Sequence, residues 1–142
     1  ALVTGASGLL GVQHSKALLE VGATVVLTDI DQMSLLKAYS NLVDIFGDER
    51  VICKKMDVTS EASINNVIDD LAEIKLHVSI LINNAAIDPK VNQDSVVETS
   101  RLENFLLEDW NFQLNVGLTG AMLCSKIIGT KMSLKEGGVI LN

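Results

Sequence analysis

Short runs of apolar and β-branched residues alternate along this chain with segments whose apolar residues have helical spacing. The expected strands are residues 1–4, 24–28, 51–56, 78–82 and 138–141. The expected helices are residues 9–21, about 31–46, about 60–71 and about 102–132, the last with a break. Strands that alternate with helices imply right-handed crossovers and a parallel sheet, and wholly apolar strands are typical of sheets covered on both faces. The sequence therefore predicts a doubly wound, three-layer α/β fold.

Composition and charge exclude several classes of protein. With 48% hydrophobic and 20% charged residues, the chain has the balance of a folded domain. A net charge of −7 argues against nucleic acid or an anionic membrane as the main partner, and no apolar run reaches the roughly 18 residues of a membrane span. Cys53 and Cys124 are the two cysteines, and no His/Cys cluster has the spacing of metal ligands. We therefore expect reduced thiols, no metal and a cytoplasmic location.

Both ends of the chain fall inside expected strands. Residues 1–4 have the character of the end of a strand, and residues 138–142 that of a strand that has just begun. A complete domain rarely starts and stops inside its sheet, since termini usually lie outside the packed elements. We therefore expect residues 1–142 to form a single incomplete domain that continues beyond residue 142.

A glycine-rich turn joins the first strand to the first helix. Gly5 would allow a tight turn, Gly8 would let backbone N–H groups approach a phosphate, and Gly11 would let the helix pack close to the sheet. The helix N-terminus offers unpaired N–H groups and the positive end of a dipole to an anion. The alternative is that the glycines only shape a turn. The residues that we expect at a bound dinucleotide are Gly5, Ser7, Gly8, Leu9, Leu10 and Gly11.

Asp29 ends the second expected strand, where an acidic side chain can accept hydrogen bonds from the ribose hydroxyls of adenosine. The same charge would repel a 2′-phosphate, and no Lys or Arg occurs in the glycine turn or at positions 30–36. The sequence therefore favours NAD over NADP as cofactor. The alternative is that Asp29 caps the following helix, a role that Asp31 could fill instead.

Taken together, the motifs resemble the short-chain dehydrogenases/reductases (SDR family) over essentially all 142 residues. The resemblance rests on the glycine turn, on Asp29, on Met56-Asp57-Val58 and on Ile82–Ala86, which is similar to the family's Asn-Asn-Ala-Gly. It implies a Rossmann-like NAD(P)-binding domain of an NAD-dependent oxidoreductase. Such an enzyme transfers a hydride between nicotinamide and a small alcohol or ketone, with sugar-related compounds among the candidate substrates. It also implies a homodimer or homotetramer.

The resemblance assigns roles to individual residues. Asp57 would contact the adenine amino group and Val58 would pack on the adenine ring. Asn84, Ala85 and Ala86 would lie beside the ribose nearest the nicotinamide, while Asn83 would tie strands together. Without the resemblance, Asp57 is simply a residue at the start of a helix, and the two asparagines are a polar strand end.

The chain departs from the family pattern at three places, of which the smallest is Ala86, where the family has glycine. Leu9 stands where classical members have glycine, and the spacing through Gly8 is more typical of extended members, the nucleotide-sugar epimerases and dehydratases. Aligning Trp110 and Gly120 with the family's helix pattern puts Gly117 at the position of an asparagine that supports a proton-relay water. Asn115 could serve only if the helix is distorted. We favour a relay without this asparagine.

The family's catalytic Ser and Tyr-x-x-x-Lys pair are not recognisable here, and by resemblance they would follow Asn142. An extended-type epimerase or dehydratase therefore stays open as an alternative, as does a non-catalytic NAD(H)-binding regulator. The polar stretch 88–101 is longer than usual and leaves the carboxyl end of a strand, so we expect it to border the substrate. Arg101 could bind an acidic group there, and the alternative is a surface role. An apolar helix face would meet either a second subunit or the core; it comprises Phe105, Leu106, Trp110, Leu114, Leu118 and Met122.

Overall fold

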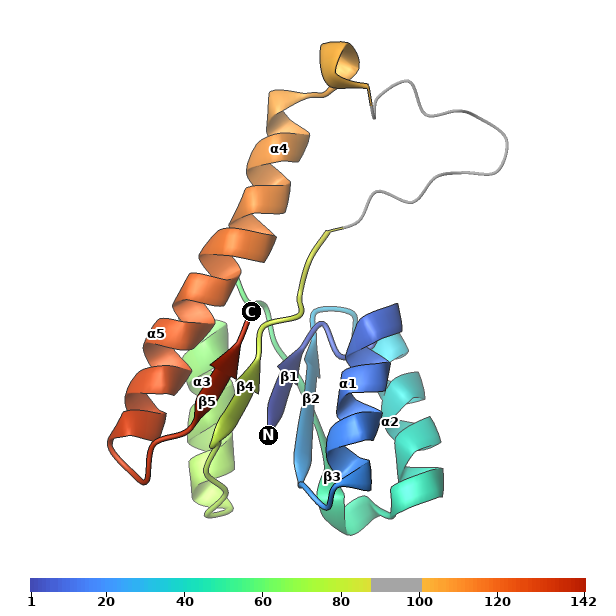
Figure 1. Ribbon diagram of the computed structural model, residues 1–142, viewed down its shortest axis with the longest axis vertical. Helices are drawn as coiled ribbons and strands as arrows, with labels where there is room; N and C mark the ends of the chain where they lie inside the picture. The colour runs from blue at the N-terminus through green and yellow to red at the C-terminus, as the bar shows by residue number, and fades with distance from the viewer. Residues whose placement is uncertain (88–100) are drawn as a thin grey trace.

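The computed structural model of the chain describes residues 1–87 and 101–142. Five parallel strands form one sheet in the order β3-β2-β1-β4-β5. The strands are β1 (Leu2–Thr4), β2 (Val25–Asp29), β3 (Val51–Lys55), β4 (Ile80–Ile82) and β5 (Val139–Leu141). The predicted doubly wound α/β fold is confirmed (Figure 1).

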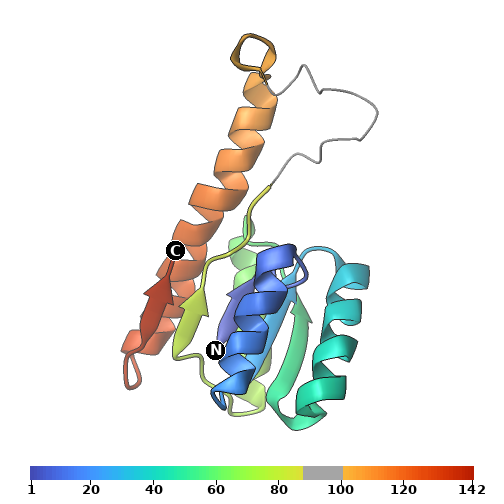
Figure 2. The same cartoon turned by 45° about the vertical axis from the view of Figure 1, so that its right-hand side comes forward.

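Helices cover both faces of the sheet, as Figure 2 shows from a second side. The helices α1 (Leu9–Glu20) and α2 (Gln32–Phe46) lie on one face, and α3 (Glu61–Glu73) and α5 (Gly120–Ser133) lie on the other. A further helix, α4 (Leu107–Leu114), precedes α5, and short 3₁₀ helices span Asp48–Arg50 and Leu102–Asn104. This is the three-layer arrangement that the alternating sequence predicts.

Two apolar clusters, one on each face, hold the layers together. Along β1 and β2, Leu2 and Val26 pack against α3 and α5, while Val3, Val25 and Leu27 pack against α1 and α2. All five side chains are at most 1% exposed. Neighbouring residues of a strand point to opposite faces, so a strand covered on both sides is apolar except where a polar side chain is hydrogen-bonded. The buried Thr4 and Thr28 meet this condition, because their hydroxyls donate to the carbonyls of Ile82 and Val3.

The N-termini of α2 and α3 are capped by side chains. The Asp31 carboxylate accepts hydrogen bonds from the backbone N–H groups of Met33 (3.0 Å) and Ser34 (3.3 Å). The Ser60 hydroxyl accepts one from the N–H of Ser63 (3.2 Å). Asp31 is therefore the cap of α2, and the alternative in which Asp29 caps this helix is wrong.

The predicted helical region of about 102–132 is interrupted at the extended residues Phe105 and Leu106, and not at Gly117, where the sequence suggested a break. Between α4 and α5 the backbone forms a π-helical turn, Asn115–Thr119, and the residues on either side, Leu114 and Gly120, keep right-handed helical angles. A π turn accommodates one extra residue without ending the helix. The combined helix projects past the carboxyl ends of the strands (Figure 1).

Both cysteines are free thiols, as predicted. Burial raises the pKa of Cys124 to about 11 and also raises the pKa of Cys53, although Lys54 partly opposes the second shift. Both groups are therefore protonated at neutral pH, where a thiol is a poor nucleophile. Within residues 1–87 and 101–142, no group of three or more His, Cys, Asp or Glu residues could hold a metal ion. No helix in the same ranges is long and apolar enough to cross a membrane.

Candidate functional site

A groove of about 650 Å³ runs along the carboxyl ends of the strands. It lies where β1 has β2 on one side and β4 on the other, which is the switch point at which open α/β sheets bind ligands. The predicted cofactor residues that line it are Gly5, Ser7, Gly8, Leu9, Leu10, Asp29, Asp57, Val58, Asn84, Ala85 and Ala86. Gly11 does not line the groove. The structure thus gathers residues from four separate loops into one surface.

Gly5 and Gly11 are required by close backbone contacts beneath the groove. Gly5 has a φ of +60°, and a Cβ there would lie 2.9 Å from the Cα of Ala85. A Cβ on Gly11 would lie 2.2 Å from the carbonyl oxygen of Gly5 and 2.7 Å from the Cα of Ala6. These approaches are too close for any larger residue without movement of the backbone. Gly11 therefore acts from behind the groove, by letting α1 lie directly against the turn.

The N-terminus of α1 has free backbone donors that face no side-chain acceptor. Gly8 is its N-cap and supplies no capping side chain, and the first turn contains no acidic residue. The Gly8 N–H donates to the carbonyl of Gly5 (3.1 Å), and the first bond within the helix is from Val12 to Gly8 (3.1 Å). The N–H groups of Leu9 and Leu10 therefore remain available to a ligand anion, which the helix dipole also favours.

The carboxylate of Asp29 is fixed at the edge of the glycine turn. Its Oδ2 accepts hydrogen bonds from the Ser7 hydroxyl (2.6 Å) and the Ser7 N–H (3.1 Å), and its Oδ1 accepts one from the N–H of Asp31 (3.1 Å). Each carboxylate oxygen can accept further bonds. Asp29 is therefore held in place by the protein and still offers acceptor capacity to a ligand.

Hydrogen bonds across the switch point join the glycine turn to the end of β4. The Thr4 hydroxyl donates to the carbonyl of Ile82 (3.3 Å) and accepts from the N–H groups of Asn84 (2.9 Å) and Ala85 (3.0 Å). The Asn84 side-chain amide donates to the carbonyls of Thr4 (3.0 Å) and Gly5 (3.1 Å). Both of its N–H groups are therefore used inside the protein.

Asn83 ties β4 to its other neighbours, as the resemblance implies. Its side-chain amide lies 2.9 Å from the Ser125 hydroxyl of α5 and 2.7 Å from the side-chain oxygen of Asn142. The resemblance gives the role of linking strands to Asn83 alone, but the Asn84 side chain also links the end of β4 to the end of β1. Toward a ligand, Asn84 can offer its side-chain oxygen and its surface.

Asp57 has a structural role as well as a place in the groove. Its Oδ1 accepts hydrogen bonds from the N–H (2.8 Å) and the hydroxyl (2.7 Å) of Thr59, which shapes the turn that leads into α3. Next to it, Val58 is only 8% exposed and packs against Gly120 at the start of α5, where a Cβ would lie 2.7 Å from its Cγ2. The start of α5 thus positions Val58 from behind.

Sequence reasoning missed several groove residues. Ile30, Asp31, Ser34, Met56, Thr59 and Ile87 lie close in sequence to predicted positions, and Phe112 and Val116 come from the long helix. The spacing of four between Phe112 and Val116 puts them on one helix face, which was the available signal. Asn115 is exposed and does not line the groove. Asn115 lies in the π turn that distorts the helix, and its role as a relay residue stays a prediction.

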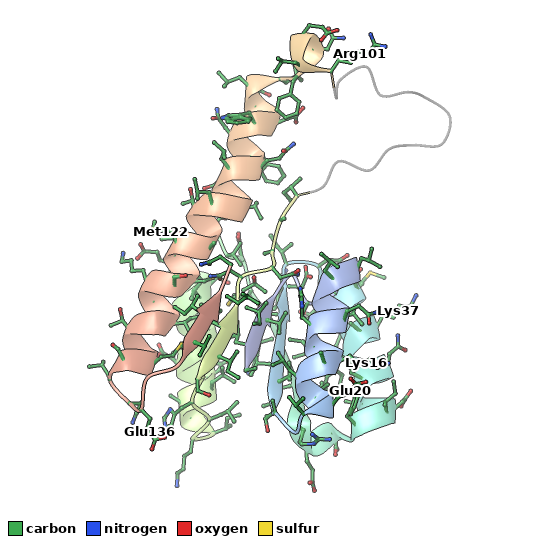
Figure 3. The ribbon with its side chains drawn as sticks, viewed as in Figure 1. Lys16, Glu20, Lys37, Arg101, Met122 and Glu136 are labelled. Carbon is green, nitrogen blue, oxygen red and sulfur yellow. The ribbon has the colours of Figure 1, made fainter. Side chains whose placement is uncertain are left out.

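The polar stretch expected to border the substrate lies outside the described residues, apart from Arg101. Figure 3 shows Arg101 beyond the end of α4, away from the sheet, and its side chain is exposed. On the apolar helix face, Leu106, Trp110, Leu118 and Met122 are between 51% and 65% exposed. These four residues therefore do not belong to the core of the described chain.

The whole chain, residues 1–142, matches the short chain dehydrogenase family. It is 31% identical over 142 residues to an uncharacterized oxidoreductase of Thermotoga maritima, covering 100% of this chain and 51% of that protein. It is 27% identical over 142 residues to an NAD-dependent glycerol dehydrogenase of Listeria innocua, covering 100% of this chain and 50% of that protein. The chain spans about half the length of these curated relatives.

Solved structures share the fold. The crystal structure of sorbitol-6-phosphate 2-dehydrogenase from Erwinia amylovora superposes with a TM-score of 0.81 at 23% identity, covering 98% of this chain and 51% of that one. The chain therefore belongs to the short-chain dehydrogenase family of NAD(P)-using oxidoreductases. The family resemblance inferred from the sequence motifs is confirmed.

Proposed function

We propose that this chain binds NAD and forms the cofactor-binding part of an oxidoreductase that acts on a small alcohol or ketone. The observation that carries the proposal is the Asp29 carboxylate, which Ser7 and Asp31 hold beside the open N-terminus of α1. A bound nicotinamide would supply or accept the hydride. The protein's part is to bind and orient the dinucleotide.

The groove residues divide between the parts of the dinucleotide. The free N–H groups of Leu9 and Leu10 would hold the pyrophosphate, and Asp29 would accept hydrogen bonds from the adenosine ribose hydroxyls. Asp57 and Val58 would lie against adenine, with Asn84, Ala85 and Ala86 beside the other ribose. The shared groove and the order of these residues around it support this division.

Charge supports NAD in preference to NADP. Among the described residues that line the groove, three are aspartates, Asp29, Asp31 and Asp57, and none is Lys or Arg. A 2′-phosphate on the ribose would lie beside the Asp29 carboxylate with no cation to offset the repulsion. The ribose hydroxyls of NAD carry no charge and can donate to the same carboxylate.

The substrate proposal stops at a small alcohol or ketone. Curated relatives are named for substrates as different as glycerol and a 3α-hydroxysteroid. Tyr39 is the chain's only tyrosine, and residue 43 is Val, so these 142 residues contain no Tyr-x-x-x-Lys pair. At the position of the family's relay asparagine, Gly117 supplies no side chain. We propose that the proton relay uses water without the support of an asparagine side chain from this helix.

We also propose that the protein is a homodimer or homotetramer. The apolar face of the long helix supports this, because Leu106, Trp110, Leu118 and Met122 are all more than half exposed. Met122 lies on the outer side of α5 (Figure 3). Sedimentation of the full-length protein tests the proposal, and a monomer at micromolar concentration would reject it.

Cofactor affinity tests the main proposal directly. Calorimetric titration of the full-length protein is expected to show tighter binding of NAD than of NADP. Asp29→Ala removes a charged hydrogen-bond acceptor, so it should weaken NAD binding about 10- to 100-fold and remove the discrimination against NADP. Asp48→Ala is the matched control, because it removes one exposed carboxylate far from the groove.

Two outcomes would change the assignment. Tighter binding of NADP than of NAD by the unaltered protein would overturn the cofactor proposal. NAD binding without NAD-linked turnover across a panel of alcohols, ketones and sugars would favour the non-catalytic alternative instead.

A further inference from the structure

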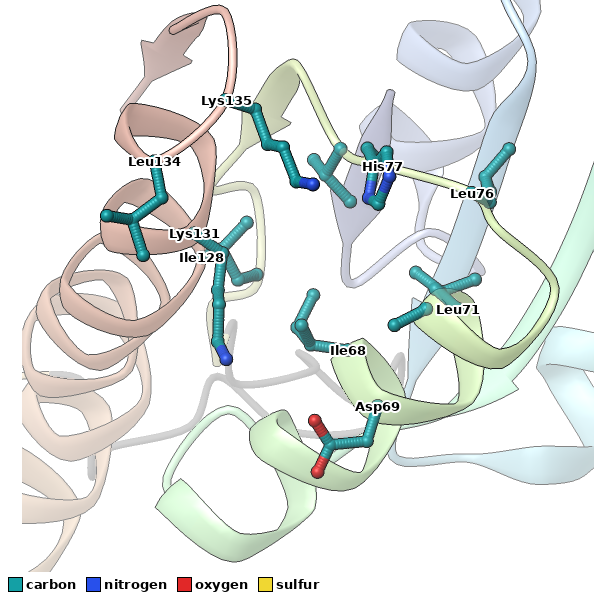
Figure 4. Close-up of a pocket in the computed structure, with 11 residues that line it drawn as sticks. Ile68, Asp69, Leu71, Leu76, His77, Ile128, Lys131, Leu134 and Lys135 are labelled. Atoms are coloured by element: carbon teal, nitrogen blue, oxygen red, sulfur yellow. The ribbon is translucent and has the colours of Figure 1, made fainter.

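A second cavity, of about 430 Å³, lies at the opposite edge of the sheet from the groove. It is bounded by the C-terminal ends of α3 and α5 and by the loop that leads into β4 (Figure 4). This volume falls within the usual range for small-molecule sites. The cavity shares no residue with the proposed cofactor groove, so any function that it has is separate.

The inner wall of the cavity is aliphatic. Ile128 of α5 is fully buried, and Ile68 and Leu71 of α3 are 9% and 1% exposed. Figure 4 shows the side chains of these three residues facing the space between the two helices. Leu76 and Val78 also line the cavity and are only partly buried, so they offer a hydrocarbon chain the apolar surface that the three buried residues lack. Burying each methylene strengthens binding by about fourfold.

Cationic side chains surround the same space. Lys131 of α5 and Lys135, two residues after α5 ends, line it together with His77, which can donate a hydrogen bond from its ring. In Figure 4, the Lys135 side chain extends toward the side of the cavity on which His77 lies. Asp69 is the one acidic residue among those that line the cavity. In a chain with a net charge of −7, this is a local excess of positive charge.

The two lysines are not engaged within the described part of the chain. On the same two helices, Lys126 pairs with Glu61 at 2.9 Å, and Lys54 of β3 pairs with Asp70 at 2.7 Å. Neither Lys131 nor Lys135 has an ion pair or a side-chain hydrogen bond among the described residues. Their ammonium groups are therefore available to a ligand.

Lysines near a helix C-terminus can also simply stabilise the helix dipole. Here the end of α5 already has backbone donors, because the N–H groups of Lys135 (3.0 Å) and Gly137 (3.1 Å) both bond to the carbonyl of Met132. The end of α3 is closed in the same way, by the N–H of Leu76 on the carbonyl of Leu71 (2.9 Å). The lysine side chains are therefore not needed as donors to these carbonyls.

We propose that this cavity binds an aliphatic carboxylate of medium chain length. The carboxylate would lie between Lys131 and Lys135, with His77 as a further donor, and the hydrocarbon chain would lie along Ile68, Leu76 and Val78. The combination of an apolar wall with unpaired cations at its rim matches this class of ligand and matches neither a fully polar anion nor a neutral hydrocarbon.

Titration of the full-length protein with octanoate tests the proposal. Calorimetry should show one saturable site per chain, with binding at least about tenfold weaker for 1-octanol, which lacks the charge, and for acetate, which lacks the chain. The double variant Lys131→Gln/Lys135→Gln should lose about tenfold in octanoate affinity. Lys16→Gln/Lys37→Gln is the matched control, because it removes two lysines from α1 and α2 on the other face (Figure 3).

A second variant fills the cavity without removing a contact. Ala72 lines the cavity and is exposed, so Ala72→Trp should block octanoate while the circular dichroism spectrum stays unchanged. The proposal is overturned if octanoate shows no saturable binding, if octanol binds as tightly, or if the two lysine double variants bind alike. A lower thermal midpoint for Lys131→Gln/Lys135→Gln, with no octanoate binding by the unaltered protein, would instead assign the lysines to the helix dipole.

Discussion

Three helices, α1, α2 and α3, begin at the carboxyl edge of the same sheet, but their first turns are built differently. Asp31 caps α2 with two hydrogen bonds, and Ser60 caps α3 with one. The first turn of α1 has no cap, and Leu9 and Leu10 are 86% and 61% exposed there. Glycine at an N-cap costs only about a few tenths of a kcal/mol relative to a capping side chain, so Gly8 leaves the donors of α1 open at little cost to stability.

The difference separates structural from functional helix ends. The N-termini of α2 and α3 each have a side chain that accepts hydrogen bonds from first-turn N–H groups. The N-terminus of α1 leaves its donors open at the switch point of the sheet, where β1 lies between β2 and β4. The helix that lacks its own acceptor is therefore the one placed to receive an anion.

The largest expected effect comes from pushing α1 away from the turn. Gly11→Ala would place a Cβ 2.2 Å from the Gly5 oxygen, and we expect a loss of about 3 kcal/mol in the free energy of unfolding. NAD affinity should fall with it, because the free N–H groups would move. Urea unfolding and calorimetry measure the two effects.

Gly117→Ala is the matched control for this prediction. A Cβ at Gly117 meets nothing within 4 Å, so the change should raise stability by up to about 1 kcal/mol through helix propensity. Native-like stability and NAD affinity in Gly11→Ala would show that the close contact does not constrain α1.

Giving α1 an acidic first turn makes it resemble a capped helix. Leu9→Glu should raise the free energy of unfolding by about 0.5 kcal/mol, because a carboxylate favours the positive end of the helix. It should also weaken NAD binding by about tenfold, since the carboxylate repels the pyrophosphate. Leu9→Gln has the same shape without the charge and should change neither quantity. Equal NAD affinities for the two variants would contradict the proposed pyrophosphate site.

Removing the cap of α2 makes its N-terminus resemble the uncapped N-terminus of α1. Asp31→Ala should lower the free energy of unfolding by about 1 kcal/mol. The effect on NAD affinity should be smaller than that of Asp29→Ala, because Asp31 caps a helix whose donors do not face the phosphates. Asp31→Asn keeps a capping oxygen and should retain most of the stability. A larger loss of NAD affinity for Asp31→Ala than for Asp29→Ala would indicate that Asp31, and not Asp29, binds the ribose.

The smallest effect is expected from the support of Asp29. Ser7→Ala removes the 2.6 Å bond from the hydroxyl but keeps the backbone bond to the same carboxylate oxygen. We expect the ratio of NAD to NADP affinity to narrow by about fivefold, equivalent to one ordinary hydrogen bond. Ser34→Ala removes a similar 2.7 Å bond to Asp31 and should leave that ratio unchanged. If the ratio of NAD to NADP affinity falls equally in Ser7→Ala and Ser34→Ala, Ser7 has no specific role in supporting Asp29.

The parts of the fold that local chemistry determines were predictable from the sequence. The boundaries of α2 follow from Asp31 as its N-cap and from Gly47, which ends it with a φ of +83°. The need for Gly11 was predictable for the same reason, because its close contacts are with Gly5 and Ala6, whereas the close contact of Gly5 is with Ala85, far along the chain.

The remaining features depend on contacts between distant segments. Gly117 suggested a break, but the helix continues as a π turn, with Val116 packed on the core and Gly120 against Val58. The groove positions of Phe112 and Val116 depend on where the long helix crosses the sheet edge. Propensity and periodicity carry no information about that crossing.

The hydroxyl of Thr4 has a consequence for how a ligand reaches the groove. Separating β1 from β4 at the switch point would break the hydrogen bonds that the Thr4 hydroxyl accepts from the N–H groups of Asn84 and Ala85. It would also break the bonds from the Asn84 side-chain amide to the carbonyls of Thr4 and Gly5. Entry by separation of the strands is therefore costly, and the open route passes over the exposed first turn of α1. The backbone amides of Asn84 and Ala85 should consequently exchange with deuterium slowly, whether or not the groove is filled.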